Sequence, residues 1–191
     1  SAFSDVISKS NMTLSSVELL NEESVPKDAA AIIINAPQKD FNKNDAQKVI
    51  DYLQKGGKAI IVGMHSETEM PNFASILDTY GVSLTTGPIA DNDAQHYYNM
   101  GGPLYLLPNV NSSSYTGSLS GGYVYLPISL GINYPQNSTT DDTESTEESK
   151  TTYTSLLDTS DDAVAKNNPN SMQDYGYEDG DDKGPFSVGL A

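Results

Sequence analysis

Two short, uninterrupted apolar runs constrain the fold of this chain more than any other feature. They are Ala30–Ile34 and Ala59–Val62, and such runs are typical of strands buried on both faces of a parallel sheet. Between them, apolar residues recur at the spacing of one helix face, at Ala46, Val49, Ile50 and Leu53. The pattern predicts two parallel neighbouring strands joined by a helical crossover over Lys43–Lys55.

The same alternation continues after the second run. A second helix is predicted where apolar residues again repeat at helical spacing, at Phe73, Ile76, Leu77 and Tyr80. Each helix has start and stop signals, which are Asn42 with Asp45 and then Gly56-Gly57 for the first, and Pro71 and then Gly81 for the second. Val82–Leu84 follows as a third strand. This order of elements predicts an α/β fold with a mainly parallel, flavodoxin-like sheet and flanking helices.

The flanking segments carry weaker patterns. Phe3–Lys9 is predicted as a helix and Leu14–Leu19 as a strand, and a helix that leads into a strand suggests that a further strand precedes it. Towards the C-terminal third we expect extra short strands, at Leu104–Leu107, Tyr123–Leu126, Tyr153–Leu157 and Phe186–Leu190. Residues 1–191 are together long enough for a sizeable core and are expected to form a single α/β domain.

Two polar segments are predicted to be loops within that domain. Residues 136–152, with the sequence QNSTTDDTESTEESKTT, contain no apolar side chain, so burial cannot offset the entropy lost on ordering. We expect this acidic low-complexity loop to be exposed and mobile. Asn167–Gly184 has a similar composition and is predicted to behave in the same way.

Charge and composition exclude several classes of function. The formal net charge is −16 and the chain contains no arginine, so it lacks the basic, forked side chains with which proteins hold phosphate backbones. We therefore expect no nucleic-acid binding and no direct docking on an anionic membrane. Cysteine is also absent, which excludes disulfides, thiolate metal ligands and a cysteine nucleophile.

The letters Leu119-Ser-Gly-Gly122 match the start of the LSGGQ signature of ATP-binding cassette (ABC) ATPases. Such a site also needs a P-loop, and the only Gly-Lys pair, Gly57-Lys58, lacks both the glycine five residues earlier and the Ser or Thr that should follow. The residues after the motif, Tyr123–Leu126, favour a strand over a helix. We therefore predict a turn at Gly121-Gly122 and no ATPase activity.

Polar side chains follow both apolar runs, where the C-terminal ends of parallel strands meet at one edge of a sheet. They are Asn35 and Gln38 after the first run, and His65, Ser66 and Glu67 after the second. With no arginine present, these groups suit a neutral polar ligand such as a sugar better than a phosphate. Because three consecutive residues point in diverging directions, His65, Ser66 and Glu67 cannot relay a proton among themselves. A polar loop that binds nothing is the alternative.

Two further patterns point only weakly to a ligand. Asp179–Gly184 resembles the start of a calcium loop, but Lys183 and Leu190 occupy positions where an EF-hand needs oxygen ligands, and the two histidines lack zinc spacing. We expect a solvated acidic loop there, and neither a metal nor a cofactor. Tyr97, Tyr98 and Tyr105 gather near a Gly-Gly-Pro turn and could stack against sugars, although tyrosine is also common in exposed loops.

These elements resemble a known family. The stretch Val25–Gly63, VPKDAAAIIINAPQKDFNKNDAQKVIDYLQKGGKAIIVG, is similar to the core of the GldG-like auxiliary domains of ABC-type transport systems. That pattern consists of VP-x-D, an apolar strand, a PxxD loop and a helix that ends in YL-x-x-GG. Shorter pieces follow in the same order, at Pro103–Pro108, Leu156–Asp161 and Lys183–Phe186. The resemblance covers most of residues 14–191 apart from the acidic loop, but the family's first strand and its GHGE-like turn are absent.

The resemblance implies a non-catalytic accessory domain on the extracytoplasmic face of a bacterial membrane, within a longer membrane-anchored chain. Its partners would be the permease and ATPase subunits of an ABC transporter, and it would touch the membrane only through segments outside this chain. Its fold would be similar to the class I glutamine-amidotransferase-like layer, without the catalytic cysteine. The alternatives are a small-molecule or carbohydrate-binding module that uses the strand ends, and a degenerate amidotransferase-like hydrolase, which the missing nucleophile geometry disfavours.

Overall fold

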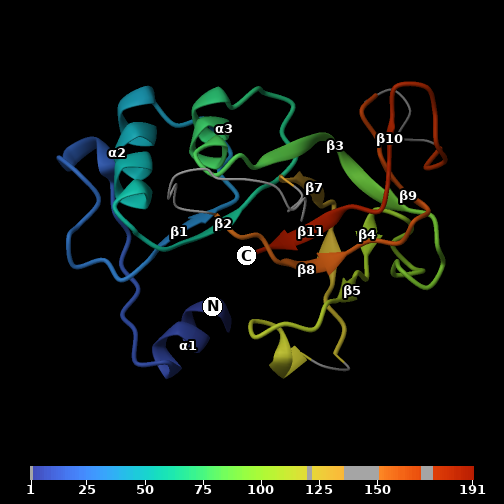
Figure 1. Ribbon diagram of the computed structural model, residues 1–191, viewed down its shortest axis with the longest axis horizontal. Coiled ribbons are helices and arrows are strands. Elements are labelled where there is room, and N and C mark those ends of the chain that lie inside the picture. Colours follow the sequence, from blue (N-terminus) through green and yellow to red (C-terminus); the bar gives the residue numbers. More distant parts are fainter. Residues whose placement is uncertain (1, 120–121, 136–150, 169–173) are drawn as a thin grey trace, which may run out of the picture.

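The structure is a computed structural model that describes residues 2–119, 122–135, 151–168 and 174–191 (Figure 1). Two residues of the LSGG motif, 120 and 121, and residues 136–150 of the predicted acidic loop lie outside this part of the chain. The α-helices in the described part are α1 (Ala2–Lys9), α2 (Lys43–Gln54) and α3 (Pro71–Asp78), and none of them is long and apolar enough to cross a membrane. Two short 3₁₀ turns are η1 (Leu19–Asn21) and η2 (Gly117–Leu119).

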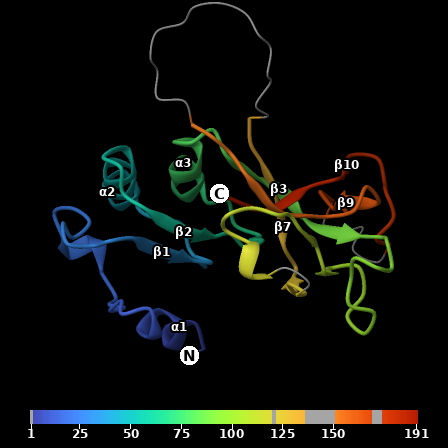
Figure 2. The same cartoon turned by 60° about the horizontal axis from the view of Figure 1, so that its bottom comes forward.

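The two apolar runs form neighbouring parallel strands, β1 (Ile32–Asn35) and β2 (Ala59–Val62), with Ile32 opposite Ala59 and Asn35 opposite Val62. This confirms the predicted pairing and its crossover through α2. Helices α2 and α3 cover one face of the pair, as the two views in Figures 1 and 2 show. Their shared core consists of Ile34, Ala46, Val49, Leu53, Phe73 and Ile76. We call β1, β2, α2 and α3 the parallel unit.

Both helices of the parallel unit start and stop at the predicted signals. Asn42 Oδ1 accepts a hydrogen bond from the Asp45 N–H at 2.9 Å, which satisfies one of the free amides at the start of α2. Pro71 occupies the first turn of α3, where a missing N–H costs nothing. Beyond the helix ends, Gly56 and Gly81 have φ angles of +87° and +64°, a region that glycine adopts without strain.

The rest of the described chain is organised around one antiparallel sheet with the strand order β10-β9-β3-β7-β11-β8-β5, which we call the large sheet. Its strands are β3 (Ser83–Asp91), β5 (Asn109–Val110), β7 (Leu130–Asn133), β8 (Ser155–Asp158), β9 (Ala163–Ala165), β10 (Asp182–Lys183) and β11 (Ser187–Leu190). A separate short pair joins β4 (Tyr105–Leu106) to β6 (Leu126–Pro127). In Figure 1 the large sheet lies to the right of the parallel unit.

The predicted fold class is wrong. Most of the strands in the described chain belong to the antiparallel large sheet, so the molecule is not a mainly parallel, flavodoxin-like or amidotransferase-like layer. The error begins at Val82–Leu84, which overlaps only the start of β3 (Ser83–Asp91) and forms no ladder with β2. Strand β3 pairs antiparallel with β7 and β9. Gly87 and Pro88 interrupt the apolar pattern of β3, and such residues normally mark the end of a strand.

The remaining predictions of local structure were partly correct. Helix α1 is confirmed, and four predicted short strands overlap β4, β6, β8 and β11, although β4 and β6 contain only two residues each. The segment Leu14–Leu19 is not a strand, since extended chain there leads into η1. Within Asn167–Gly184, predicted to be a mobile loop, residues Asp182 and Lys183 form β10 and pair with β9.

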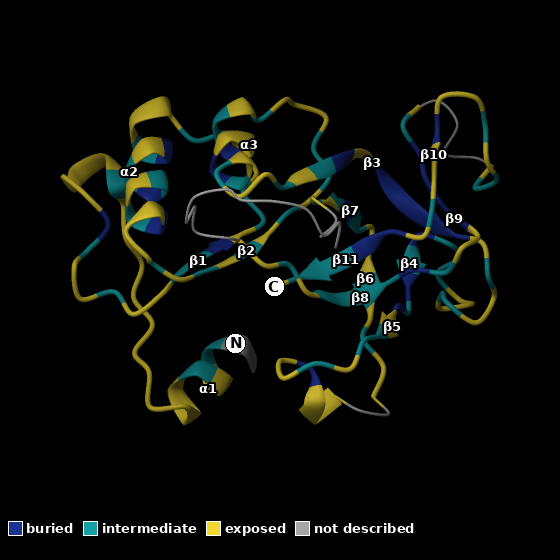
Figure 3. Cartoon of the chain, in the orientation of Figure 1, coloured by how far each residue is buried: buried dark blue, intermediate teal, exposed yellow. Residues whose placement is uncertain are grey.

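Much of β3 and all of β9 are buried (Figure 3), and the large sheet buries charged groups beside its apolar core. That core contains Ile89, Leu106, Ala163, Ala165 and Phe186. Next to it, Lys166 Nζ lies 2.6 Å from Asp181 Oδ2, with both side chains fully inaccessible to solvent. Lys166 also contacts Glu178 Oε2 at 3.3 Å and donates to the Gly176 carbonyl at 2.7 Å. The prediction of a solvated acidic loop at Asp179–Gly184 is therefore wrong for Asp181.

Candidate functional site

The loops that follow β1 and β2 lie side by side at one edge of the parallel unit. The Ala36 N–H donates to the Val62 carbonyl at 3.0 Å, and Gln38 Nε2 lies 3.9 Å from Met64 Sδ. Ala36 has a φ of +46°, a left-handed conformation that costs a residue with a side chain about 1–2 kcal/mol. The structure thus brings together the two loops that carry Asn35, Gln38, His65, Ser66 and Glu67.

The five predicted site residues are not hydrogen-bonded to one another in the described chain. Gln38 Nε2 donates to the Ala36 carbonyl at 3.0 Å. Ser66 Oγ accepts from the Thr68 N–H at 3.1 Å and donates to the Thr68 carbonyl at 2.9 Å. Asn35 and Glu67 are exposed. His65 Nδ1 is buried and has no partner among the residues that the structure describes.

This arrangement favours binding chemistry over bond cleavage. The Ser66 hydroxyl is engaged within its own turn, and no imidazole is hydrogen-bonded to it as a catalytic serine would require. A buried polar atom without a partner, such as His65 Nδ1, costs about 1–3 kcal/mol that a ligand's hydrogen bond could recover.

The face of β1 and β2 that turns away from the helices is apolar and open to solvent. Side chains alternate along a strand, so Ile61 packs on the helix core while Ile60 and Val62 point to the opposite side, together with Ile33. Ile60 is 52% exposed, Val62 43% and Met64 39%. Helix α1 lies on this side of the pair (Figure 2). We call Ile33, Ile60, Val62 and Met64 the outer face.

A hydrogen-bonded histidine, His96, lies in the loop after β3. The only sign of this contact in the sequence is the Asp-x-x-His spacing from Asp93 to His96. His96 Nδ1 lies 3.0 Å from Asp93 Oδ2, and Nε2 lies 3.2 Å from Asn109 Oδ1. The Gln95 N–H, helped by His96, holds the pKa of Asp93 below its ordinary value. A carboxylate–imidazole pair resembles part of a hydrolase triad, but here the second nitrogen faces an amide oxygen and no hydroxyl. The hydrogen bonds of Asp93, His96 and Asn109 therefore join this loop to β5.

The tyrosines near the Gly-Gly-Pro turn pack mainly on one another. The Tyr125 ring meets Tyr98 edge-on at 5.9 Å and stacks on Tyr105 at 6.1 Å, measured between ring centroids. Tyr97 instead forms a β-bridge with Leu106. These contacts support the β4–β6 pair. Within the described ranges, no group of three or more His, Asp or Glu side chains is arranged to hold a metal ion.

Comparison with solved structures finds a similar fold. A structure described as "mmIFT52 N-terminal domain" matches with a TM-score of 0.54 at 13% sequence identity, over 85% of this chain and 70% of that chain. At this identity the likeness concerns the fold alone, because one fold supports many functions. No protein-family model matches the sequence, and no curated protein matches it either.

Proposed function

We propose that this chain is a non-catalytic accessory domain of an ABC-type transport system, which works on the extracytoplasmic face of a bacterial membrane by contacting the permease subunit. The resemblance of Val25–Gly63 to GldG-like domains supports the choice of system. The observation that carries the contact role is the outer face, where Ile60 and Val62 are about half exposed although both belong to a strand of a parallel pair.

Parallel strands are normally covered on both faces, because their crossovers place helices there. Helices α2 and α3 cover one face of β1 and β2, whereas Ile60, Val62 and Met64 remain in water on the other. Each square ångström of apolar surface removed from water contributes about 25 cal/mol. A protein surface laid against the outer face would supply the missing layer and gain that free energy.

The charge of the chain specifies the chemistry of this partner. Acids outnumber lysines by 26 to 10, so the negative charge of the chain repels a partner surface that is itself negatively charged. An interface with an apolar centre and lysines or arginines at its rim fits both the outer face and the net negative charge of the chain. We assign that surface to the extracytoplasmic part of the permease.

A site-specific crosslink tests this assignment. A photoreactive residue in place of Ile60, in cells that contain the complete transport system, should crosslink to the permease subunit, as identified by mass spectrometry. The same residue in place of Tyr123, which is 89% exposed outside the parallel unit, should not. Val62→Asp should abolish the Ile60 crosslink without lowering the melting temperature. Crosslinks only to unrelated proteins, or equal crosslinking from Tyr123, would overturn the proposal.

The unpartnered His65 Nδ1 favours a second candidate, a small-molecule or carbohydrate-binding module at the strand ends. Titration with neutral glycans and peptides would detect it, with His65→Ala and Gln38→Ala as matched variants. Binding that either change abolishes supports this candidate, and binding that both leave intact places the ligand elsewhere. A degenerate hydrolase is disfavoured because the Ser66 hydroxyl is engaged by Thr68.

A further inference from the structure

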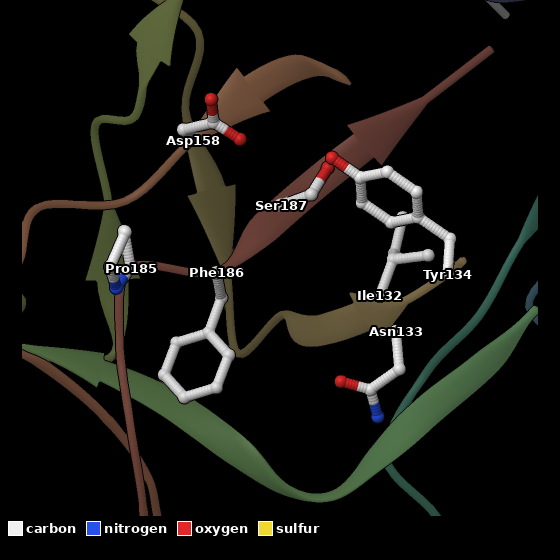
Figure 4. Close-up of a pocket in the computed structure, with 7 residues that line it drawn as sticks. All are labelled: Ile132, Asn133, Tyr134, Asp158, Pro185, Phe186 and Ser187. Carbon is white, nitrogen blue, oxygen red and sulfur yellow. The ribbon is translucent and has the colours of Figure 1, made fainter. Parts of the chain in front are cut away.

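A pocket of about 330 Å³ opens in the large sheet where β7, β8 and β11 meet (Figure 4). Strand β11 pairs with β7 at Ser187 opposite Ile132, and its register with β8 shifts on both sides of Gly189. Such irregularities bend a strand and open the ladder locally. The pocket is lined by Ile132, Asn133, Tyr134, Asp158, Pro185, Phe186 and Ser187.

The polar wall of this pocket offers hydrogen-bond acceptors. Asp158 Oδ1 accepts from Ser155 Oγ at 2.5 Å, and Oδ2 accepts from Asn111 Nδ2 at 2.6 Å. Each carboxylate oxygen can accept a second bond, so Asp158 retains acceptor capacity. The single hydroxyl proton of Ser155 can be donated to Ser187 Oγ, at 2.8 Å, instead of to Asp158. Ser187 Oγ itself donates to the Gly189 carbonyl at 3.1 Å, so one of its lone pairs remains available.

No side chain of the described chain neutralises this carboxylate. The ion pairs found among the described residues join Lys48, His96 and Lys166 to other acids. A primary ammonium group provides three donors and no acceptor, and its hydrogen bonds to a carboxylate are charge-assisted. The excess of acids over lysines also raises the local concentration of cations. The acceptors in the pocket therefore match an ammonium group.

The remaining lining indicates the body of the ligand. Ile132 and Pro185 supply the apolar part of the lining, against which the carbon face of a sugar ring can lie, whereas the Phe186 ring packs in the core of the large sheet. In the part of the chain that the structure describes, the Tyr134 hydroxyl is not seen to hydrogen-bond, so it can meet a ligand hydroxyl, whereas the Asn133 amide points to the other side of the strand (Figure 4). The volume is at the lower end of the range for ligand pockets, about 300–1,000 Å³. We propose that this pocket binds an amino sugar of monosaccharide size, with its ammonium group on Asp158.

Titration of the ¹⁵N-labelled protein with glucosamine, at mildly acidic pH where the amine is protonated, tests this proposal. We expect shifts centred on the amides of Asn133, Asp158 and Ser187, and an affinity at least about tenfold higher than for glucose, which lacks only the amine. N-acetylglucosamine, which has lost the charge, should bind as weakly as glucose. Equal binding of the three sugars, shifts centred elsewhere, or no binding of glucosamine would overturn the proposal.

Matched charge variants separate a specific contact from general attraction of cations. Asp158→Asn should weaken glucosamine binding by about tenfold or more, whereas Asp162→Asn, which removes an exposed charge outside the pocket lining, should leave it unchanged. Equal losses in both variants would contradict a pocket contact. The shift map of the unmodified protein decides the question even if Asp158→Asn destabilises the fold. The pocket residues are not part of the outer face, so this result is independent of the crosslinking experiment.

Discussion

The parallel unit and the large sheet bury different kinds of side chain. Beneath α2 and α3 the core is entirely apolar, from Ile34 in β1 to Ile76 in α3. In the large sheet, buried charged groups lie beside the apolar residues. Asp91 accepts hydrogen bonds from the Ser160 N–H at 2.9 Å and from Ser160 Oγ at 2.5 Å, and Lys166 is paired with Asp181.

This difference shows which changes each region can tolerate. In an apolar core, a truncated side chain costs free energy in proportion to the volume that is lost. In a buried polar network, the loss of one group leaves its partner desolvated and unpaired, which costs more than the pair contributes. We therefore expect that removal of a buried charge is the most damaging change in the large sheet. In the parallel unit, the most damaging change should be truncation of a buried aliphatic side chain.

The largest effect is expected for Lys166→Met. Burial would lower the pKa of Lys166, but its hydrogen bonds to Asp181 and Glu178 hold that pKa above its ordinary value, so the pair is charged. Methionine would leave the buried Asp181 carboxylate without its counter-ion, held only by the N–H groups of Asn167 and Glu178, and the free energy of unfolding should fall by about 3–5 kcal/mol. Urea denaturation at neutral pH measures this quantity.

Two variants sharpen that test. Lys183→Met removes a lysine from the neighbouring strand β10, where its ammonium lies 4.2 Å above the Tyr177 ring, and should cost no more than about 1 kcal/mol. Lys166→Met combined with Asp181→Leu removes both charges and should recover much of the lost stability. If Lys166→Met costs less than Lys183→Met, the large sheet does not depend on its buried pair.

In the parallel unit, Ile76→Ala is expected to cost about 2–5 kcal/mol. Ile76 is completely buried between α2 and α3, so the deletion leaves a cavity. The matched change Ile60→Ala, on the outer face, should cost less than about 1 kcal/mol because that side chain is already half in water. Chemical denaturation of both variants measures the contrast. Equal losses would mean that the outer face is buried in solution.

The parallel unit was predictable because its signals are local. Two apolar runs, a helical period and four capping residues lie within about 50 residues of one another, and each signal acts on its neighbours. The large sheet depends on pairs far apart in the chain, such as Ile89 with Ala165. In β3, Gly87 is required because a Cβ there would lie 1.7 Å from the Lys166 carbonyl, and the Pro88 carbonyl accepts the Lys166 N–H. A Gly-Pro pair in a sequence normally indicates a turn.

The two candidate sites differ in the same way, since one lies in the parallel unit and the other in the large sheet. The proximity of Asn35, Gln38, His65, Ser66 and Glu67 could be predicted because each ends or follows one of the two strands that the sequence revealed. The pocket combines the ends of β7 and β8 with the start of β11, and their pairing was not predicted. Asp158, Ser187 and Asp181 are residue types that are usually exposed, so polarity alone gives no sign that they line a pocket or are buried.

Asp40 provides an exception to the apolar character of the parallel unit. Its oxygens accept the N–H groups of Asn72 and Phe73, at 3.1 and 2.8 Å, at the start of α3. Burial would raise the pKa of Asp40, but these hydrogen bonds hold it below the ordinary value of 3.8. A lowered native pKa stabilises the fold above pH 3.8, and this contribution is lost as the pH falls through the native pKa.

Asp40→Asn should therefore reduce stability by about 1–2 kcal/mol at neutral pH, because a neutral amide accepts these hydrogen bonds more weakly. The difference from the unmodified protein should shrink as the pH is lowered below 3.8. Urea denaturation across this pH range measures it. Asp28→Asn, at an exposed position, is the control for the change in net charge and should show little effect. A difference that stays constant with pH would indicate that the charge of Asp40 is irrelevant.

The smallest effect is expected at the N-terminus of α2. Asn42→Ala removes the acceptor of the Asp45 N–H and should cost about 1 kcal/mol, which corresponds to a fall in melting temperature of about 2–4 °C. The cost is limited because water can reach this helix end and replace the lost acceptor, whereas it cannot reach Lys166. Asn44→Ala, at the second residue of the same helix, should be neutral or slightly stabilising because alanine has the higher helix propensity. Scanning calorimetry of the two variants separates capping from propensity. Equal melting temperatures would show that the cap contributes nothing, and a loss at Asn42 as large as that at Lys166 would remove the proposed distinction between solvent-exposed and buried polar groups.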